Sequence, residues 1–239
     1  MCRWSIFLTL TNSKKMIYIE NKKRKLERIQ QDYPNADILD LTSKSAYAQM
    51  LSPFYPHMNI PVPNSPGVTA SCVEAVWQGL KVFENEDIDT RLFNNTTMKN
   101  IKRTQRVHGK TLGHRFGVDG KELLDYFSAR MRIYLPTYKY ILENQAHNLV
   151  MKIAERAKDH DIIFLDYNTN TEVRDISSPI SHAGLVKLYI EGNYPDESQH
   201  LCPMTNEEIA QRKRVLKEEK KQRKVKIKDD NSIQEPTLF

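Results

Sequence analysis

The sequence predicts a helix-rich α+β fold: a single domain with a small sheet over residues 16–195, followed by a basic C-terminal helix or tail over residues 196–239. Two observations favour this class. Long stretches with apolar residues at helical spacing are separated by a few short β-type runs, and 239 residues are enough to bury one core. Met16 is an alternative start, so residues 1–15 are expected to be an ill-ordered leader.

The N-terminal part predicts short elements joined by turns. They are a strand over 16–19, a helix over 22–31 that the turn at 32–35 ends, and a strand over 38–41. Residues 51–67 contain five prolines, so this segment is expected to be an extended loop. The aromatic residues Phe54 and Tyr55 favour a functional role for a loop of this length.

The C-terminal part predicts longer helices around one buried strand. One helix is expected on each side of Pro136, and a helix capped by Ser181 follows a polar loop. The expected elements are helices over 121–134 and 137–157, a strand over 161–166, and helices over 181–190 and from 205 onward.

Residues 71–83 predict a helix that carries chemistry on one stripe. Glu74, Gln78 and Lys81 lie at positions i, i+4 and i+7, which places a carboxylate, an amide and an ammonium group on one side. A carboxylate and an amine at a pocket wall can break a bond at a sugar C1 by activating water or by direct attack. The stripe beside it can pack against a core and consists of Val73, Val76, Trp77 and Leu80.

The same residues allow a structural interpretation. Ser71 followed three positions later by Glu74 is also the pattern of a capping box, in which the glutamate bonds the helix N-terminus and does no chemistry. The spacing alone favours neither alternative.

A glycine-rich segment follows this helix. Residues 109–120 hold four of the eight glycines of the chain, interleaved with basic side chains. Such a loop lets backbone amides approach phosphates closely, although ordinary turns are the favoured explanation of the glycines. The residues that would contact DNA phosphates here are Lys110, His114 and Arg115.

The positive charge of the chain is concentrated near its C-terminus. Residues 212–228 hold ten Lys or Arg and two Glu, a net charge of +8, while the whole chain carries +6. This segment is predicted to be a nucleic-acid-binding arm, with a solvated helix face or a disordered solubility tail as the alternative. The arm residues expected to contact DNA are Arg212, Lys213, Arg214, Lys220 and Lys221.

Several classes of protein are disfavoured. The three cysteines lie far apart without a CxxC pair, and the histidines show no metal-ligand spacing, so we expect a cytoplasmic protein with no metal and no cofactor. No apolar run approaches the roughly 20 residues that span a membrane.

Two segments resemble the paired motifs of the NADAR (YbiA-like) N-glycosidase superfamily. They are Ser52-Pro53-Phe54-Tyr55-Pro56 and the series Ser71, Glu74, Gln78, Lys81. Later segments match in the same order, so that the resemblance spans about residues 50–190. These are Met131 with Tyr138–Asn144, Asp161–Asn168, and Ser181–Tyr189.

The resemblance implies a NADAR-like fold over residues 16–195 and cleavage of a base from C1 of a ribose-type sugar. Glu74 is then the carboxylate that stabilises the oxocarbenium-like centre or activates the nucleophile. Lys81 either attacks C1 as a neutral amine or binds phosphate, and Asp166 assists catalysis. The substrate-binding residues would be Ser52, Phe54, Tyr55, Trp77, Gln78 and Asn168; Trp77 could equally belong to the core, and Asp166 and Asn168 could be turn formers.

The leading functional hypothesis is a DNA N-glycosylase that flips out a modified base, such as a glucosylated cytosine of phage DNA in a defence system. The glucosylated base rests on likeness to a defence-linked branch of the family. The first alternative is an N-glycosidase of ADP-ribose derivatives or ADP-ribosylated guanine, and the second is a non-catalytic nucleic-acid-binding adaptor. The ending 234–239 resembles peptides that bind the sliding clamp, which would be a further partner.

Overall fold

Strands β1 (Ile17–Asn21), β8 (Ile162–Asp166) and β2 (Asp37–Asp40) form a parallel sheet with β8 in the centre. This computed structural model describes residues 16–232, with side chains through residue 222. All five residues of β8 are buried, as is usual for a parallel strand covered on both faces. The bounds of β2 and β8 confirm the strands expected over 38–41 and 161–166 within one residue at each end.

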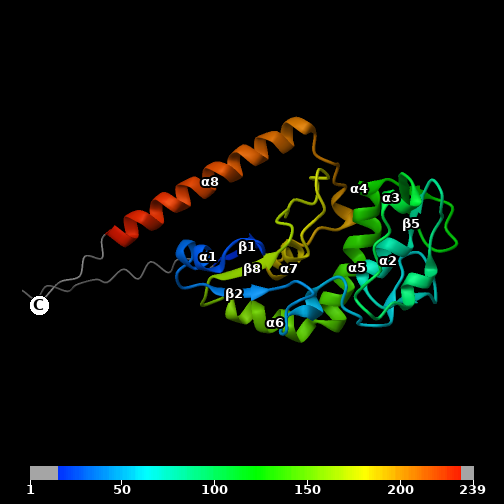
Figure 1. The fold of residues 1–239 in the computed structure, drawn as a ribbon, viewed down its shortest axis with the longest axis horizontal. Helices are drawn as coiled ribbons and strands as arrows, with labels where there is room; N and C mark the ends of the chain where they lie inside the picture. The colour runs from blue at the N-terminus through cyan, green and yellow to red at the C-terminus, as the bar shows by residue number, and fades with distance from the viewer. Residues whose placement is uncertain (1–15, 233–239) are drawn as a thin grey trace, which may run out of the picture.

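The two faces of β8 pack against different helices (Figure 1). Ile162 and Phe164 belong to a large core that includes residues of α6 (His147–Arg156) and α7 (His182–Ile190). Ile163 and Leu165 pack instead against Ile29 of helix α1 (Leu26–Asp32) on the other face. The alternation along β8 follows the two-residue period of a strand.

A second core lies beside an antiparallel sheet. Strands β5 (Lys81–Phe83), β6 (Thr111–Arg115) and β7 (Leu123–Leu124) form this sheet, and β3 (Ile60–Pro61) pairs with β4 (Thr69–Ala70). Helix α2 (Val73–Gly79) contributes Val73 to the first core and Ala75 and Val76 to the second. The short helix α3 (Gln105–His108) precedes β6.

A single helical segment from Tyr126 to Gln145 connects the two cores. It consists of α4 (Tyr126–Ala129), a π-helical turn (Arg130–Tyr134), α5 (Leu135–Tyr140) and a second π-helical turn (Ile141–Gln145). Ile133 packs in the core beside the antiparallel sheet, whereas Leu135 and Tyr138 pack in the larger core. Residues from one helix thus hold both cores in a fixed relation.

The expected helix boundaries in this region are wrong. Residues 121–125 are not helical, because Leu123 and Leu124 form β7. The helix then continues through Pro136 and is interrupted at Ala146. The π turn before Pro136 widens the helix and accommodates a ring that an α-helix interior would exclude. The helix expected over 22–31 also begins later, at Leu26.

Helix α8 (Asn206–Ser232) follows a capping box of Thr205 and Glu208 (Figure 1). Ile209 is buried, and Arg174 and Glu208 form an ion pair between the first turn and the loop that follows β8. From residue 213 to residue 222 the side chains of α8 are exposed. Within residues 16–232, no helix combines the length and apolar character needed to cross a membrane.

Arg130 anchors the loop between β8 and α7. The residue is 1% exposed, and its guanidinium group donates hydrogen bonds to the carbonyl oxygens of Val173 (2.7 Å), Asp175 (2.9 Å) and Ser178 (2.9 Å). A buried guanidinium needs such partners, because a charge without them would carry a large desolvation penalty.

We predict that Arg130→Met destabilises the fold by about 3 kcal/mol. The buried carbonyl oxygen of Val173 loses its side-chain donor, and those of Asp175 and Ser178 keep only the bonds from Asn170. Urea unfolding measures the change. Lys139→Met on the same helix is the matched control, since Lys139 makes only an exposed pair with Glu143 and its loss should cost about 0.5 kcal/mol or less. Equal losses in the two variants would contradict the anchoring role.

Candidate active site

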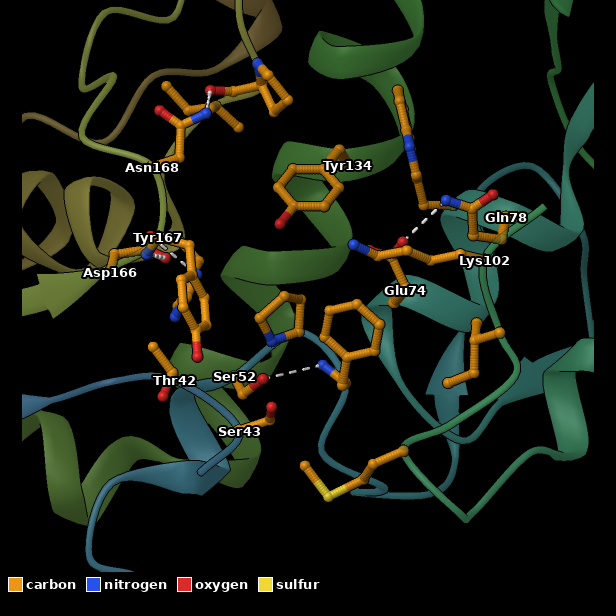
Figure 2. A pocket seen from close by; sticks show the side chains of 18 of the residues that line it. Thr42, Ser43, Ser52, Glu74, Gln78, Lys102, Tyr134, Asp166, Tyr167 and Asn168 are labelled. Carbon is orange, nitrogen blue, oxygen red and sulfur yellow. Dashed lines mark hydrogen bonds and ion pairs between the residues drawn. The ribbon is translucent and has the colours of Figure 1, made fainter. Parts of the chain in front are cut away.

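A pocket of about 1020 Å³ lies between the two cores, at the carboxyl end of β8 (Figure 2). One side is formed by Asp166, Tyr167 and Asn168, with Thr42 and Ser43 following β2. The other side is formed by α2 and by residues 98–102. Open parallel sheets bind ligands at the carboxyl ends of their strands, so this position is typical of a ligand site.

Helix α2 brings Glu74 to the pocket wall. Its N-cap is Cys72, whose sulfur accepts a hydrogen bond from the amide of Ala75 at 3.3 Å. Ser71 donates its hydroxyl proton to the carbonyl oxygen of Asn95 instead. The capping box is therefore not formed, and the Glu74 carboxyl group is directed into the pocket, where it is 8% exposed.

Gln78 fixes the orientation of the Glu74 carboxyl group. The backbone amide of Arg103 donates to Gln78 Oε1 at 3.1 Å, which assigns the oxygen and nitrogen of the Gln78 amide. Gln78 Nε2 consequently faces Glu74 Oε1 and donates to it at 2.8 Å. Within the described chain no side chain donates to the second oxygen of Glu74, so Glu74 Oε2 remains available to a ligand or a water molecule.

Lys81 joins the same network from outside the helix. Helix α2 ends at Gly79, and Lys81 is the first residue of β5, so the expected helix over 71–83 is too long. The amine still reaches the predicted stripe and donates to Gln78 Oε1 at 3.0 Å. Gln78 therefore lies between Lys81 and Glu74 and keeps them from forming a direct ion pair.

Burial shifts both ionisable groups of this network toward their neutral forms. Desolvation raises the pKa of Glu74 above its usual value of 4.5, although the bond from Gln78 and the charges of Lys102 and Lys81 oppose it. Desolvation also lowers the pKa of Lys81. Opposed shifts of a carboxyl group and an amine in one pocket are typical of functional sites.

Asp166 is held by an ion pair at the opposite side of the pocket. His182 Nδ1 lies 3.1 Å from Asp166 Oδ2, and His182 Nε2 lies 2.9 Å from the carbonyl oxygen of Leu41. Both ring nitrogens face acceptors, an arrangement that favours the imidazolium form. Burial favours its neutral form, but Asp166 raises the pKa of His182 above its usual value.

Asp166 has its acceptor positions largely filled. Oδ2 also accepts from the Ser181 hydroxyl at 2.6 Å, and Oδ1 accepts from the Tyr167 amide. Burial opposes ionisation, yet His182 and these hydrogen bonds hold the pKa of Asp166 below its usual value. These contacts favour a positioning role for Asp166 and leave Glu74 as the carboxyl group with a free oxygen.

Aromatic residues form the remaining walls. Trp77 is half-buried and packs against His114, with ring centroids 3.8 Å apart and the planes tilted by 31°. Phe54 also lines the pocket. Trp77 thus takes part in both core and pocket. Tyr55 does not line the pocket and contacts His57 instead, so its predicted contact with substrate is not supported.

The other predicted binding residues lie at the pocket. Ser52 is buried, and its hydroxyl accepts from the Phe54 amide at 3.3 Å. Asn168 donates to the carbonyl oxygen of Pro179 at 2.7 Å and so supports the loop that forms the wall.

Several pocket residues were not predicted from the sequence, and four of them carry side chains that matter for the site. Tyr134 and Arg130 come from the π turn, His182 from the first turn of α7, and Lys102 from the basic segment after α2. The expected N-cap at Ser181 was a usable signal for His182, because it places the next residue beside the end of β8.

The glycine-rich segment forms strand β6 and its turn, and two of its basic residues are buried or half-buried. His114 is 1% exposed, and burial lowers its pKa to about 3. Arg115 forms a two-bonded ion pair with Asp87. Only Lys110 of this group is exposed. The buried ring of His114 cannot reach a phosphate, so this expected contact is wrong. Arg115 is half-buried, and its contact with phosphate stays a prediction.

Close approach of backbones explains the glycines. A Cβ at Gly117, which has φ +92°, would lie 2.1 Å from the carbonyl oxygen of Asn64. At Gly113 it would lie 2.4 Å from the carbonyl oxygen of Leu124. Any side chain at these two positions would collide with the backbone of the adjacent segment.

The arm residues divide into two groups. Arg212 contacts the loop after β8, with its guanidinium 3.8 Å from Asp175 and 3.3 Å from the Thr171 hydroxyl. Four basic side chains are exposed and remain candidates for contact with an anionic polymer: Lys213, Arg214, Lys220 and Lys221. In the described part of the chain, no three His, Cys, Asp or Glu side chains are grouped to hold a metal ion.

Glu74→Gln is predicted to stabilise the protein at about pH 8 by about 1 kcal/mol, or roughly 2–4 °C in the unfolding midpoint. The unfolded chain loses the Glu74 proton near pH 4.5, whereas the folded protein keeps it to higher pH, so stability falls as the pH rises through this window. Glutamine removes this effect while it still accepts from Gln78.

Thermal unfolding at about pH 4 and pH 8 tests this prediction. The gain should vanish near pH 4, where both states are protonated, and Glu143→Gln at an exposed position should show no comparable gain at pH 8. A destabilising effect of Glu74→Gln at pH 8 would show that the carboxyl group is not held as described.

Comparison with known proteins places the chain in a family without assigning an activity. The family of unknown function DUF6939 matches residues 21–186, from the end of β1 into α7. This range includes Glu74, Gln78, Asp166 and His182. No curated protein matches the chain. Because the match covers well over half of the sequence, the chain belongs to the DUF6939 family.

Proposed function

We propose that this protein is an N-glycosidase that cleaves the bond between a base and C1 of its sugar, with a modified base in DNA as the substrate. The observation that carries the proposal is the Glu74 carboxyl group, which is buried in a pocket, oriented by Gln78 and open to a ligand through Oε2. The resemblance of the sequence to NADAR N-glycosidases implies the same role for Glu74.

In the proposed reaction the base leaves with the bonding electrons and positive charge develops at C1. Glu74, as a carboxylate, stabilises this charge and accepts a proton from the attacking water. A raised pKa makes Glu74 a stronger base than an exposed glutamate, although it also requires a higher pH for ionisation. The rate should therefore increase with pH across the titration of Glu74.

Lys81 has two roles consistent with its surroundings. Its lowered pKa favours the neutral amine that a direct attack on C1 requires. Its hydrogen bond to Gln78 also supports the orientation of Glu74. Lys102, whose ammonium lies 5.4 Å from the centre of the Phe54 ring, is exposed near the pocket and suits a phosphate of the substrate.

The charge of the arm supports a nucleic acid as the substrate. Exposed lysine and arginine residues on α8 attract DNA phosphates without regard to the base sequence. The pocket then receives a base that is flipped out of the DNA double helix. Trp77 and Phe54 offer aromatic surfaces for this base.

The pocket volume favours a second candidate, an N-glycosidase of ADP-ribose derivatives or ADP-ribosylated guanine. A pocket of about 1020 Å³ is at the upper end of the range for small-molecule sites and exceeds the need of one base. The adaptor alternative is less favoured, because its explanation for Glu74 was a capping box that Ser71 does not form.

We predict that Glu74→Gln reduces base release by at least about 100-fold, since the amide cannot act as a base or balance positive charge. Mass spectrometry of bases released from several modified DNAs, including glucosylated phage DNA, and from ADP-ribosylated guanosine measures activity. Glu143→Gln is the control and should keep full activity. Unchanged activity of Glu74→Gln would refute the assignment of Glu74.

A second prediction concerns the arm. Replacing Lys213, Arg214, Lys220 and Lys221 by glutamine should weaken DNA binding and reduce the slope of log affinity against log salt by up to about 4. Arg212→Gln should leave the slope unchanged, because Arg212 is engaged with Asp175. If the variant with all four substitutions keeps the wild-type slope, the arm is a solvated helix face. The N-glycosidase of ADP-ribose derivatives is then the favoured candidate.

A further inference from the structure

Tyr134 lines the pocket but has no part in the reaction described so far. It lies at the end of the π turn Arg130–Tyr134, and π turns are frequent at functional sites. Its ring stacks parallel to Tyr138, with centroids 6.2 Å apart, and meets Trp77 edge-on at 5.6 Å. Two neighbouring rings therefore fix the position of this side chain.

The hydroxyl group of Tyr134 has no protein partner in the described chain. Neighbouring tyrosines differ in this respect, since Tyr138 donates to the carbonyl oxygen of Leu51 at 2.6 Å and Tyr126 accepts from Arg130. Figure 2 shows the Tyr134 hydroxyl directed into the space between Asp166 and Glu74. A rigid ring thus presents an unused hydrogen-bond donor to a ligand.

The surroundings keep this hydroxyl protonated. Burial raises the pKa of Tyr134 well above 10, and the negative charges of Glu74 and Asp166 add to the effect. A phenol in this state donates a hydrogen bond but does not give up its proton at neutral pH. Tyr134 is therefore suited to stabilise negative charge on a neighbouring group.

We propose that Tyr134 is a catalytic residue that donates a hydrogen bond to the departing base while Glu74 acts at C1. This inference rests on the proposed glycosidase function. It separates the two charges of the transition state: the positive charge at C1 lies against Glu74, and the negative charge that grows on the base lies against the Tyr134 hydroxyl.

The electron and proton balance needs no further reactant than water. The C1–N bond breaks, and its electron pair leaves with the base. The water oxygen bonds to C1 and gives one proton to Glu74. Tyr134 keeps its own proton throughout, and the released base takes a proton from solvent.

The test compares Tyr134→Phe with the wild-type protein on DNA that carries the base the wild type releases, with and without a ring fluorine on that base. Tyr134→Phe should lower kcat by about 100-fold and leave KM nearly unchanged. The loss should be smaller for the fluorinated base, because a better leaving group needs less stabilisation. Tyr140→Phe on the same helix should keep wild-type kinetics, and Tyr134→Phe should unfold at the wild-type temperature.

Each other outcome is decisive. A kcat of Tyr134→Phe within twofold of wild type on both bases would overturn the role of Tyr134 and leave the glycosidase intact. An equal loss of kcat on the two bases would also overturn it, because the loss would not depend on the leaving group. A loss of the same size in Tyr140→Phe would overturn it too, because the effect would not be specific to Tyr134. Failure of the wild-type protein to release any base would overturn the proposed function, and this role with it.

Discussion

The hydrogen bond from Gln78 to Glu74 is the interaction on which the candidate site depends. The Arg103 amide fixes the direction of the Gln78 side chain, so the amide can donate to Glu74 and accept from Lys81 at the same time. A neutral amide placed between a carboxyl group and an amine prevents their direct pairing. Glu74 is then buried and Lys81 half-buried without a direct ion pair, which is why desolvation shifts their pKa values in opposite directions.

The fold supports this arrangement by building the pocket where two cores meet. The helical segment from Tyr126 to Gln145 contributes side chains to both cores, and Arg130 ties the loop after β8 to the same segment. The pocket walls thus come from elements with separate hydrophobic support. Partly unpaired polar groups in a pocket reduce stability, and the surrounding cores allow the protein to tolerate them.

The parts of the site set by local spacing could be predicted from the sequence, and the parts set by distant contacts could not. Glu74 and Gln78 follow from the i, i+4 spacing, and β8 and α7 follow from an apolar run and an N-cap. Tyr134 could not be found in this way, because a π turn before Pro136 determines its direction. His114 was misassigned because its burial depends on pairing between β5, β6 and β7, which no local pattern reveals.

The pKa of Glu74 is the property that most directly distinguishes a buried pocket carboxyl group from an ordinary surface one. NMR titration of the protein labelled with ¹³C at the glutamate carboxyl carbons, with the Glu74 resonance assigned by its absence in Glu74→Gln, gives the pKa of this one group. We predict that the pKa of Glu74 lies above the usual 4.5. A Glu74 pKa at or below 4.5 would contradict a buried carboxyl group poised in the pocket.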